Sequence, residues 1–516
     1  MKKLRLILSI PIFLLLTWYF LDFAEILPPQ LQILADIQFI PALLALNWIV
    51  VVSLILATLI FGRIYCSSVC PLGIYQDIIG WIRKKTATKK KRKRYKYLKP
   101  LNLMRWAFVA VVVLAFITGF SFLVGLLDPY SSFGRIAVHG LKPAYQAGNN
   151  LLASILNGDT TFYKVSIYLG SISSVTIALV SMAVVGILAW RNGRIYCNTV
   201  CPVGTVLGAV SKYSLFQIRF DSEKCNLCGS CTRNCKASCI DFKNMTVDAS
   251  RCINCFNCLE ACSESGLKYR LPMKMKTATI SRAFEANQPH NRSELRHDSR
   301  RRFLTAVAVT GWAAMRLSAD KTLKLGDKKA VSRQQPIMPP GAIDLNHFST
   351  RCTSCHLCVS KCPSHVIKPS FLEYGIGGMM QPMLFFDRKF CNYDCIICSE
   401  VCPTGALLPL TREEKRVRQI GVVQLYLENC IVYTDETSCG ACSEHCPTQA
   451  VHMVPYKNHL TIPEINKEIC VGCGGCEYIC PSKPWKSIIV EGIPKHNNIR
   501  LVADEVVEHE IDDFGF

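Results

Sequence analysis

Twenty-four of the 29 cysteines fall into six groups of four, and this grouping constrains the fold more than any other feature of the chain. The groups follow the spacing C-x-x-C-x-x-C-x-x-x-C or a close variant of it. In bacterial ferredoxins, three cysteines of such a group bind one cubane cluster and the fourth ligates its neighbour. Zinc sites usually use two separated C-x-x-C pairs, and disulfide scaffolds belong to small secreted chains, unlike this one of 516 residues. The grouping therefore predicts α+β ferredoxin domains with about six [4Fe–4S] clusters.

The first two groups lie close together and form a two-cluster pattern. The crossover rule assigns Cys225, Cys228, Cys231 and Cys262 to one cluster and Cys252, Cys255, Cys258 and Cys235 to the other. Lys236 and Ser263 stand where such motifs usually carry proline. Cys239 is surplus, and we interpret it as a packed thiol.

Four further groups predict a four-cluster domain. They are Cys352, Cys355, Cys358 and Cys362; Cys391, Cys395, Cys398 and Cys402; Cys430, Cys439, Cys442 and Cys446; and Cys470, Cys473, Cys476 and Cys480. The second group has one extra residue in its first gap, and the third has its first cysteine displaced upstream. Pairing of consecutive groups needs the shortest connections, and nested pairing is the alternative.

The first of these groups also contains a second signature. Cys352-Thr-Ser-Cys355-His356 matches the haem c attachment sequence. Because Cys358 and Cys362 complete the cubane spacing, we expect no haem c.

Four apolar stretches precede the cysteine groups, at residues 4–21, 41–61, 103–127 and 165–189. The last three are long enough to cross ~30 Å of hydrocarbon, and the first is near the lower limit. A signal peptide is the alternative for the first stretch, but Asp22 and Glu25 follow it without a small-residue cleavage site. The pattern predicts a membrane bundle of four spans.

The charge distribution predicts the orientation of this bundle. The formal net charge is +21, and eleven of the seventeen residues 83–99 are Lys or Arg. Nucleic acid is an alternative partner for such a run, but apolar segments flank it, so the positive-inside rule favours a cytoplasmic loop. The loops at residues 22–36 and 128–164 then lie outside, and we expect a multi-pass protein of a bacterial inner membrane.

An internal repeat lies within the predicted bundle. Residues 62–73 match residues 193–204 in the pattern G-R-I-Y-C-x-x-V-C-P-x-G. A structural role for Gly, Arg and Pro at a helix end leaves the paired cysteines unexplained. We therefore expect Cys66, Cys70, Cys197 and Cys201 to have a redox or cluster-binding role. If the two copies meet, these cysteines supply four ligands to one more centre.

A twin-arginine sequence separates the two cysteine-rich parts. Ser299-Arg-Arg-Arg-Phe-Leu304 matches the S-R-R-x-F-L core of an export signal and opens an apolar run to residue 315. A basic flank before an anchor helix is the alternative. Because clusters support the fold of such a domain, it should fold before it crosses. We expect export of the last domain by the twin-arginine machinery and insertion of the bundle by the Sec machinery; cleavage of the signal stays open.

These features divide the chain into six segments. We expect a bundle at residues 1–205, a cytoplasmic two-cluster domain at 206–272, a linker at 273–298 and a signal or anchor at 299–318. An exported four-cluster domain at 319–490 and an acidic tail at 491–516 complete the chain. The tail is either a docking site for a basic partner or a disordered end.

The paired G-R-x-x-C-x-x-x-C-P motifs and the trailing two-cluster ferredoxin resemble NapH, the membrane component of a quinol dehydrogenase, over residues 1 to about 270. NosR and CcoG are similar in the same motifs. From Ser299 to about Pro484 the chain resembles NapG, the exported four-cluster partner of NapH, so it looks like a NapH–NapG fusion. The resemblance implies electron transfer from the quinol pool to a periplasmic reductase, with nitrate reductase as the expected partner. Alternatives are an electron donor for nitrous oxide reductase and a CcoG-like or NosR-like assembly factor.

A quinol site would need a proton acceptor near the membrane. Asp128 and His139, after the third apolar stretch, are candidates. The alternatives are a helix cap for Asp128 and a surface position for His139.

Overall fold

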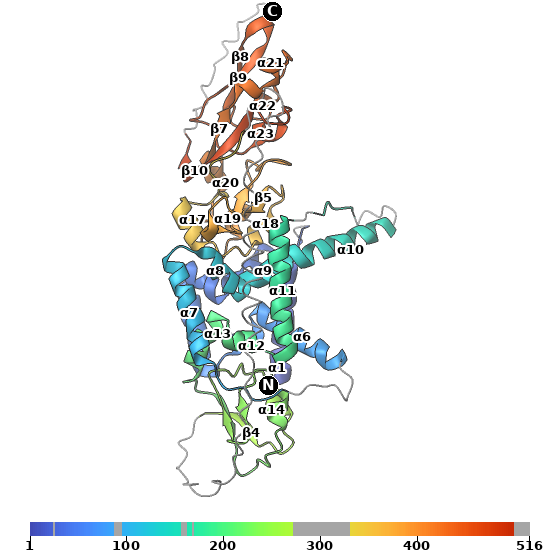
Figure 1. Cartoon of the computed structure of the whole chain (residues 1–516), viewed down its shortest axis with the longest axis vertical. Coiled ribbons are helices and arrows are strands. Elements are labelled where there is room, and N and C mark those ends of the chain that lie inside the picture. The colour runs from blue at the N-terminus through green and yellow to red at the C-terminus, as the bar shows by residue number, and fades with distance from the viewer. Residues whose placement is uncertain (24–25, 87–94, 156–162, 168–169, 272–330, 500–516) are drawn as a thin grey trace, which may run out of the picture.

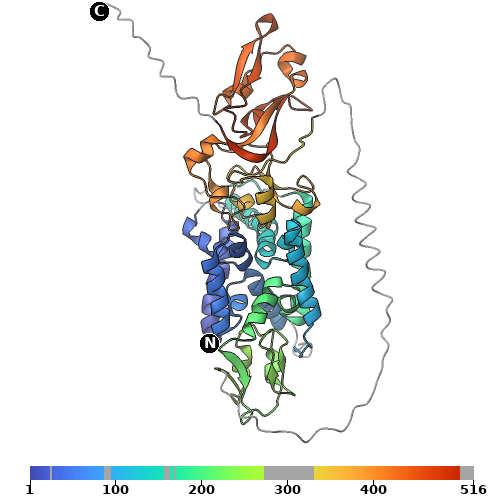
Figure 2. The ribbon, with the colours of Figure 1, turned by 90° about the vertical axis from the view of Figure 1, so that its left-hand side faces the viewer.

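The computed structural model describes the chain except for residues 24–25, 87–94, 156–162, 168–169, 272–330 and 500–516. Figures 1 and 2 show three parts stacked along one long axis, with a helical part in the middle and a small α+β part at either end. We call residues 2–211 the bundle, residues 215–270 the first module and residues 331–499 the second module. The two modules therefore lie at opposite ends of the bundle.

Four helices of the bundle correspond to the four apolar stretches: α1 (Lys2–Leu21), α4 (Trp48–Phe61), α7 (Asn102–Ile117) and α11 (Ile172–Asn192). By length and composition α1 and α11 are long and apolar enough to cross a membrane, whereas α4 and α7 are shorter. Many apolar side chains on α1 and α11 face outward; Ile7 is 67% exposed and Ile172 87% exposed. Outward-facing apolar side chains are what a lipid environment favours.

Two predicted stretches are broken where the backbone turns. The stretch at 41–61 divides into α3 (Phe39–Leu44) and α4, because Leu46 adopts a left-handed conformation and Asn47 caps α4. The stretch at 103–127 divides at Gly119 (φ 72°) into α7 and α8 (Ser121–Leu127). Glycine tolerates this conformation at a helix end without a steric penalty.

Two short helix pairs follow α4 and α11, one for each copy of the repeat. They are α5 (Ile64–Ser68) with α6 (Pro71–Thr86), and α12 (Ile195–Thr199) with α13 (Pro202–Ser211). In each pair the second cysteine directly precedes a proline at the first position of the longer helix, where the missing N–H costs nothing.

The predicted outer loop at 128–164 is largely helical in its described residues. It contains α9 (Pro129–Ile136), the π-helical turn η3 (Ala137–Leu141) and α10 (Lys142–Ile155). Two smaller elements, η1 (Pro29–Gln32) and α2 (Ile33–Asp36), follow α1.

The first module consists of two antiparallel two-stranded sheets and two short helical turns. Strand β1 (Gln217–Phe220) pairs antiparallel with β4 (Leu267–Arg270), and β2 (Ile240–Asp241) pairs with β3 (Thr246–Val247). The helical turns are α14 (Ser230–Asn234) and α15 (Asn257–Glu260).

The second module is also built from short antiparallel sheets and short helices, but it has more of both. Its antiparallel sheets are β5 (Ile367–Pro369) with β6 (Pro382–Leu384), β7 (Arg418–Leu425) with β10 (Ile488–Asn498), and β8 (Val451–Pro455) with β9 (Thr461–Ile465). Its helices are α17 (Leu345–Arg351), α18 (Leu357–Lys361), α19 (Ile397–Glu400), α20 (Arg412–Val417), α21 (Ile431–Thr434), α22 (Ala441–Glu444) and α23 (Gly475–Ile479), with the 3-10 turns η4 (Ile376–Gly378), η5 (Leu427–Asn429) and η6 (Lys457–His459). Small antiparallel sheets and short helices thus make both modules α+β, which is the fold class that the cysteine spacing predicts.

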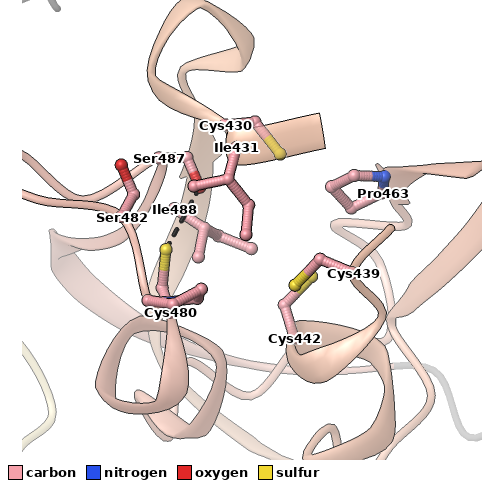
Figure 3. Close-up of a pocket in the computed structure, with 10 residues that line it drawn as sticks. Cys430, Ile431, Cys439, Cys442, Pro463, Cys480, Ser482, Ser487 and Ile488 are labelled. Carbon is pink, nitrogen blue, oxygen red and sulfur yellow. Dashed lines mark hydrogen bonds between the residues drawn. The ribbon is translucent and has the colours of Figure 1, made fainter. Parts of the chain in front are cut away.

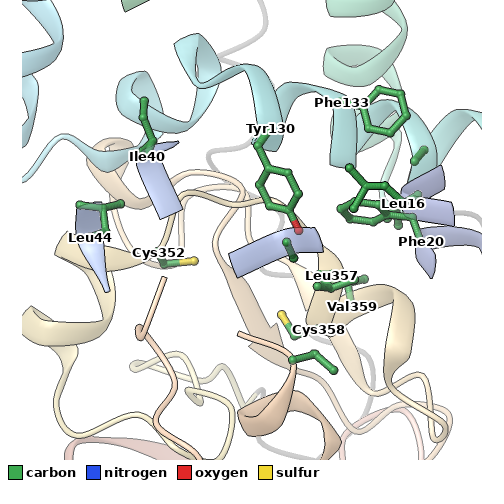
Figure 4. Packing of buried hydrophobic residues seen from close by; sticks show 14 of the residues in the cluster. Leu16, Phe20, Ile40, Leu44, Tyr130, Phe133, Cys352, Leu357, Cys358 and Val359 are labelled. Carbon is green, nitrogen blue, oxygen red and sulfur yellow. The ribbon is translucent and has the colours of Figure 1, made fainter. Parts of the chain in front are cut away.

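The second module packs closely on one end of the bundle. Figure 4 shows Phe20 of α1 and Tyr130 of α9 against Leu357 and Val359 of α18, and all four residues belong to one buried cluster. At Gly134 a Cβ atom would lie 2.4 Å from the carbonyl oxygen of Cys355, so only glycine permits this approach.

Polar contacts join the same surfaces. The ammonium of Lys361 lies 2.8 Å from Asp22, and the ammonium of Lys142 donates to the carbonyl oxygen of Ser360 at 2.6 Å. Because Asp22 and Lys361 are both buried, this ion pair ties the second module to the end of α1.

The first module is attached at the opposite end. The hydroxyl of Tyr269 donates to the carbonyl oxygen of Phe61 at 2.8 Å, and Lys236 lies 3.3 Å from Asp77. The backbone N–H of Leu215 donates to the carbonyl oxygen of Leu59 at 2.7 Å.

Candidate iron–sulfur sites

Four cysteines of the second module surround a hollow next to the bundle, which we call the docking hollow. It measures about 350 Å³ with its opening to solvent included, and its lining contains Cys352, Cys355, Cys358 and Cys402. A second hollow of about 320 Å³ is lined by Cys362, Cys391, Cys395 and Cys398. Each hollow takes three cysteines from one group and one from the other group of the pair, which is the arrangement that consecutive pairing predicts.

The other two groups of the second module exchange cysteines in the same way. Figure 3 shows Cys430, Cys439, Cys442 and Cys480 around a hollow of about 340 Å³ at the far end of the module, which we call the distal hollow. The hydroxyl of Ser487 lies 3.2 Å from the sulfur of Cys480. Cys446 is an electrostatic neighbour of the remaining three cysteines, Cys470, Cys473 and Cys476.

The fourth site adjoins the second hollow, because the backbone N–H of Cys391 donates to the carbonyl oxygen of Cys473 at 2.9 Å. The four sites therefore follow one another from the bundle to the far end of the second module.

The first module brings its cysteines together as the crossover rule predicts. Cys258 has Cys235, Cys252 and Cys255 among its electrostatic neighbours, and Cys231 has Cys225 and Cys228. The sulfur of Cys262 accepts a hydrogen bond from the N–H of Gly266, and a Cβ on Gly266 would lie 3.2 Å from Cys225.

A recurring backbone turn holds the regular groups. The residues two and four positions after the first cysteine are left-handed in four groups: Leu227 and Gly229, Asn254 and Phe256, Ser354 and His356, and Gly472 and Gly474. Such turns point successive backbone N–H groups into one concavity, which suits an anionic cluster. The described backbone shows no such pair in the two groups with altered spacing, so the sequence irregularity corresponds to a real change in the loop.

The geometry fits clusters better than single metal ions. Within the described part of the chain, no three His, Cys, Asp or Glu side chains converge closely enough to hold one ion. Zinc needs four ligand atoms within about 2.3 Å of the metal, whereas these cysteines stand around hollows. Burial raises the pKa of Cys355 to about 12 and that of Cys442 to about 12, so as free thiols they would stay protonated and unreactive.

The structure also brings together the two copies of the repeat, at a place that we call the bundle site. Cys66, Cys70, Cys197 and Cys201 are all buried and interact electrostatically with one another. One guanidinium nitrogen of Arg63 lies 3.7 Å from the sulfur of Cys66 and donates to the carbonyl oxygen of Cys197 at 3.3 Å. The side-chain amide of Gln76 donates to the sulfur of Cys197 at 3.2 Å.

The charge of Arg63 indicates what this site holds. Arg63 is fully buried, and no carboxylate of the described residues pairs with it; it contacts Asn198, Ser250 and the cysteines. By contrast, Arg194 of the second copy is paired with Asp77 at 2.8 Å. A buried cation without an anion is costly, and a cluster held by four thiolates would supply the negative charge. The residues present therefore fit an iron–sulfur cluster. From the sequence, Arg63 was interpreted only as part of a helix end, and its electrostatic role was not predicted.

Cys239 is buried, as predicted, but its sulfur lies 3.6 Å from that of Cys235. It is therefore packed directly against a predicted ligand.

The two quinol-site candidates have different surroundings. Asp128 caps α9, and its carboxylate accepts hydrogen bonds from the N–H and hydroxyl groups of Ser131 at 2.9 and 2.6 Å. Asp128 therefore has the helix-capping role that the sequence analysis gave as the alternative to a quinol site. The surface alternative for His139 is wrong, because His139 is buried and its Nε2 lies 2.7 Å from Nδ1 of His356 in the second module. Burial, with a smaller effect of Arg135, lowers the pKa of His139 to about 4.

Several predicted features lie outside the described residues. These are the linker at 273–298, the twin-arginine sequence with its apolar run, and most of the acidic tail.

Known families match most of the cysteine-rich parts of the chain, although the group Cys225–Cys235 and Cys430 lie outside the matched ranges. A 4Fe-4S binding domain family matches residues 43–90 and 175–221, which contain the two copies of the repeat. Families of 4Fe-4S dicluster domains match residues 248–366, 351–407 and 437–483. Fold and sites together define an iron–sulfur protein with several ferredoxin domains.

Three relatives show which kind of iron–sulfur protein the chain resembles. The chain is 30% identical to the ferredoxin-type protein NapG of Escherichia coli K12 over 200 residues, which are 37% of this chain and 84% of NapG. It is 30% identical to the ferredoxin-type protein NapF of the same organism over 28% of this chain and 80% of NapF. It is also 30% identical to the methylamine utilization ferredoxin-type protein MauM of Methylorubrum extorquens over 35% of this chain and 84% of MauM. No solved structure matches the chain. The chain belongs to the family of ferredoxin-type proteins that includes NapG.

Proposed function

We propose that this protein is a membrane-bound electron-transfer protein that takes electrons from quinol and delivers them to a soluble reductase on the exported side. In this proposal it joins a NapH-like bundle and a NapG-like second module in one chain. The bound clusters would supply one-electron redox chemistry, which the side chains of the protein do not provide. The bundle site would hold a seventh cluster besides the six in the modules.

One observation carries the proposal: the docking hollow lies against the end of the bundle. Thr353 and Ser354 sit between two cysteines of this hollow and contact α9 directly. The hydroxyl of Ser131 is hydrogen-bonded to that of Thr353 at 2.8 Å, and Arg135 donates to the carbonyl oxygen of Ser354 at 3.2 Å. These contacts hold the docking hollow against the end of the bundle, and we propose that quinol in the lipid reduces the second module here.

The membrane arrangement is part of the proposal. We propose that α1, α4, α7 and α11 all cross the lipid, with α3 and α8 extending the two shorter helices. The first module would then face the cytoplasm next to Lys2 and Tyr95, in agreement with the positive-inside rule. The second module would face the periplasm after twin-arginine export.

The residues around the docking hollow would have distinct tasks. Lys361 and Lys142 hold the second module on the bundle through Asp22 and Ser360. The buried apolar residues of α1 and α9 exclude water from the contact. Asp128 positions α9 as its cap, and His139 contributes a neutral hydrogen bond to His356.

The acceptor is proposed by resemblance alone. A periplasmic nitrate reductase is our first choice, because it is the expected partner of NapG-like proteins. MauM, named for methylamine utilization, is an equally similar relative, so other soluble redox enzymes remain candidates, nitrous oxide reductase among them. The distal hollow, at the opposite end from the bundle, would face such a partner.

The test is quinol oxidation by the full-length protein in nanodiscs, with the reduction of the clusters followed by electron paramagnetic resonance (EPR). We expect menaquinol or ubiquinol to reduce clusters of the second module. If quinol leaves these clusters oxidised while dithionite reduces them, the proposal is wrong. Reduction by quinol without transfer to any soluble reductase would favour the assembly-factor alternative.

A further inference from the structure

The bundle site is connected to the first module through both copies of the repeat. In the second copy, the side-chain amide of Asn198 donates to the carbonyl oxygen of Ala237 at 3.1 Å. Asn198 follows Cys197, and Ala237 lies two residues after Cys235. In the first copy, Arg63 donates to the carbonyl oxygen of Ser250 at 3.1 Å, two residues before Cys252. Cys235 and Cys252 belong to the same cysteine set of the first module.

The bundle site is also connected to the docking hollow. The hydroxyl of Tyr196, the residue before Cys197, donates to the carbonyl oxygen of Leu127 at 3.5 Å. Leu127 precedes Asp128, whose carboxylate is hydrogen-bonded to the hydroxyl of Ser131 at 2.6 Å. The same hydroxyl is hydrogen-bonded to that of Thr353 at 2.8 Å.

Thr353 follows Cys352, so bonds and hydrogen bonds lead without a break from Cys235 through Cys197 to Cys352. The linking residues are buried: Tyr196 is 6% exposed, Asp128 1% and Ser131 0%. Water is therefore excluded along the route, and the surrounding protein is fixed rather than mobile solvent.

Quinol oxidation at the docking hollow does not need this inner half of the molecule. A quinol that reduces the second module directly leaves both the bundle site and the first module without a role. Yet the bundle site has a buried counter-charge, and two separate contacts link it to a single cysteine set of the first module. This arrangement needs another explanation.

We propose that the bundle site is a relay that lets electrons cross the membrane between the two modules. A soluble low-potential one-electron donor on the side of the first module would then reduce an acceptor on the side of the second module without quinol. For each electron, the donor is oxidised by one electron and the acceptor is reduced by one; no bond forms or breaks, and no proton is required. The inference rests on the proposed function, because it assumes clusters in the same cysteine sets.

The test uses the full-length protein in quinone-free liposomes that contain trapped ferricyanide, with dithionite added outside. We expect reduction of the trapped ferricyanide well above that of protein-free liposomes. The double variant Cys66→Ser/Cys197→Ser should lose this flux together with the iron of one cluster. In detergent, EPR should still show reduction of its remaining clusters by dithionite, which verifies that the variant is folded.

A second variant leaves all cysteines in place. Ser131→Ala removes the hydroxyl that joins Asp128 to Thr353, and we expect a lower flux at unchanged iron and sulfide content. Thr118→Ala, on an exposed part of the bundle away from this route, should leave the flux unchanged.

Two results would overturn the relay. One is an electron flux with the wild-type protein that is no higher than the flux in protein-free liposomes. The other is an undiminished electron flux with the double variant after loss of the bundle-site iron. Reduction by quinol distinguishes a failure of the relay from a failure of the proposed function. If the relay alone is wrong, quinol still reduces the second module in nanodiscs; if only quinol oxidation is wrong, the dithionite-driven flux persists.

Discussion

Arg194 in the second copy of the repeat donates a hydrogen bond to the carbonyl oxygen of Cys66 in the first copy, at 2.7 Å. Arg63 makes the reciprocal contact with Cys197. A glycine in each copy allows the close approach, because a Cβ on Gly73 or Gly204 would lie 2.5 Å or less from a guanidinium nitrogen or a cysteine carbonyl. The duplication thus forms one interlocked site, in which each copy positions a cysteine of the other.

The buried charge of Arg63 distinguishes a cluster from four free thiols. If the bundle site holds an anionic cluster, Arg63→Met removes its counter-charge, and we expect lower occupancy of this site, measured as iron and sulfide per polypeptide. If the thiols are neutral, replacement of an unpaired buried cation by an apolar side chain should stabilise the protein. An Arg63→Met variant with unchanged iron and higher thermal stability would contradict the cluster. Arg63→Lys, which keeps the charge, is the control.

The exchange of cysteines between consecutive groups can be tested by spectroscopy. In Cys402→Ser we expect the EPR signal of the cluster at the docking hollow to change, because this cysteine lies with Cys352, Cys355 and Cys358. The matched variant Cys480→Ser should affect the cluster of the distal hollow instead. Identical spectral changes in the two variants would contradict consecutive pairing.

The ion pair between Lys361 and Asp22 should contribute strongly to docking of the second module. Lys361→Met leaves the Asp22 carboxylate buried without its cation, at a cost of about 3–5 kcal/mol. We expect backbone amides of residues 353–361 to exchange hydrogen faster by a factor on the order of 10²–10⁴. Arg416→Met, which breaks the exposed pair with Asp394, should change exchange little, since exposed pairs contribute about 0–1 kcal/mol. Equal exchange in both variants would show that the buried pair does not hold the module.

Docking of the second module should weaken in acid because of His139. Burial lowers the pKa of this histidine to about 4, whereas an exposed histidine has a pKa of about 6.5. The undocked state therefore binds more protons, and the contribution of His139 is complete above about pH 6.5 and is lost as the pH falls towards 4. This pKa shift corresponds to about 3 kcal/mol in the free energy of docking.

The measurement is hydrogen exchange of residues 353–361 as a function of pH, corrected for intrinsic exchange rates. His139→Phe should reduce the pH dependence, because one of the two histidines at this contact then no longer titrates. An unchanged pH profile in the variant would show that His139 does not control docking.

The cysteine sets could be predicted from the sequence because the spacing within each group is local. The C-x-x-C-x-x-C loop positions three sulfurs whatever the rest of the fold does, and the crossover rule supplies the fourth. The bundle site was predicted only as a possibility, because it depends on two segments more than a hundred residues apart in the chain.

Other features had no local signal. Asp22 and Lys361 are separated by 339 residues, and nothing in their neighbourhoods marks them as partners. His139 was read as a possible surface residue because the sequence gives no sign that another module covers it. The lengths of α4 and α7 were overestimated because hydropathy does not register the turns at Leu46 and Gly119.

The central claim is that the two modules lie on opposite faces of a membrane. It is tested most directly by protease added to spheroplasts that express the chain with one epitope tag after Phe516 and another in the β2–β3 turn of the first module. The account predicts loss of the C-terminal tag and survival of the tag in the first module until the membrane is permeabilised. Survival of both tags, or loss of both, in intact spheroplasts would contradict it.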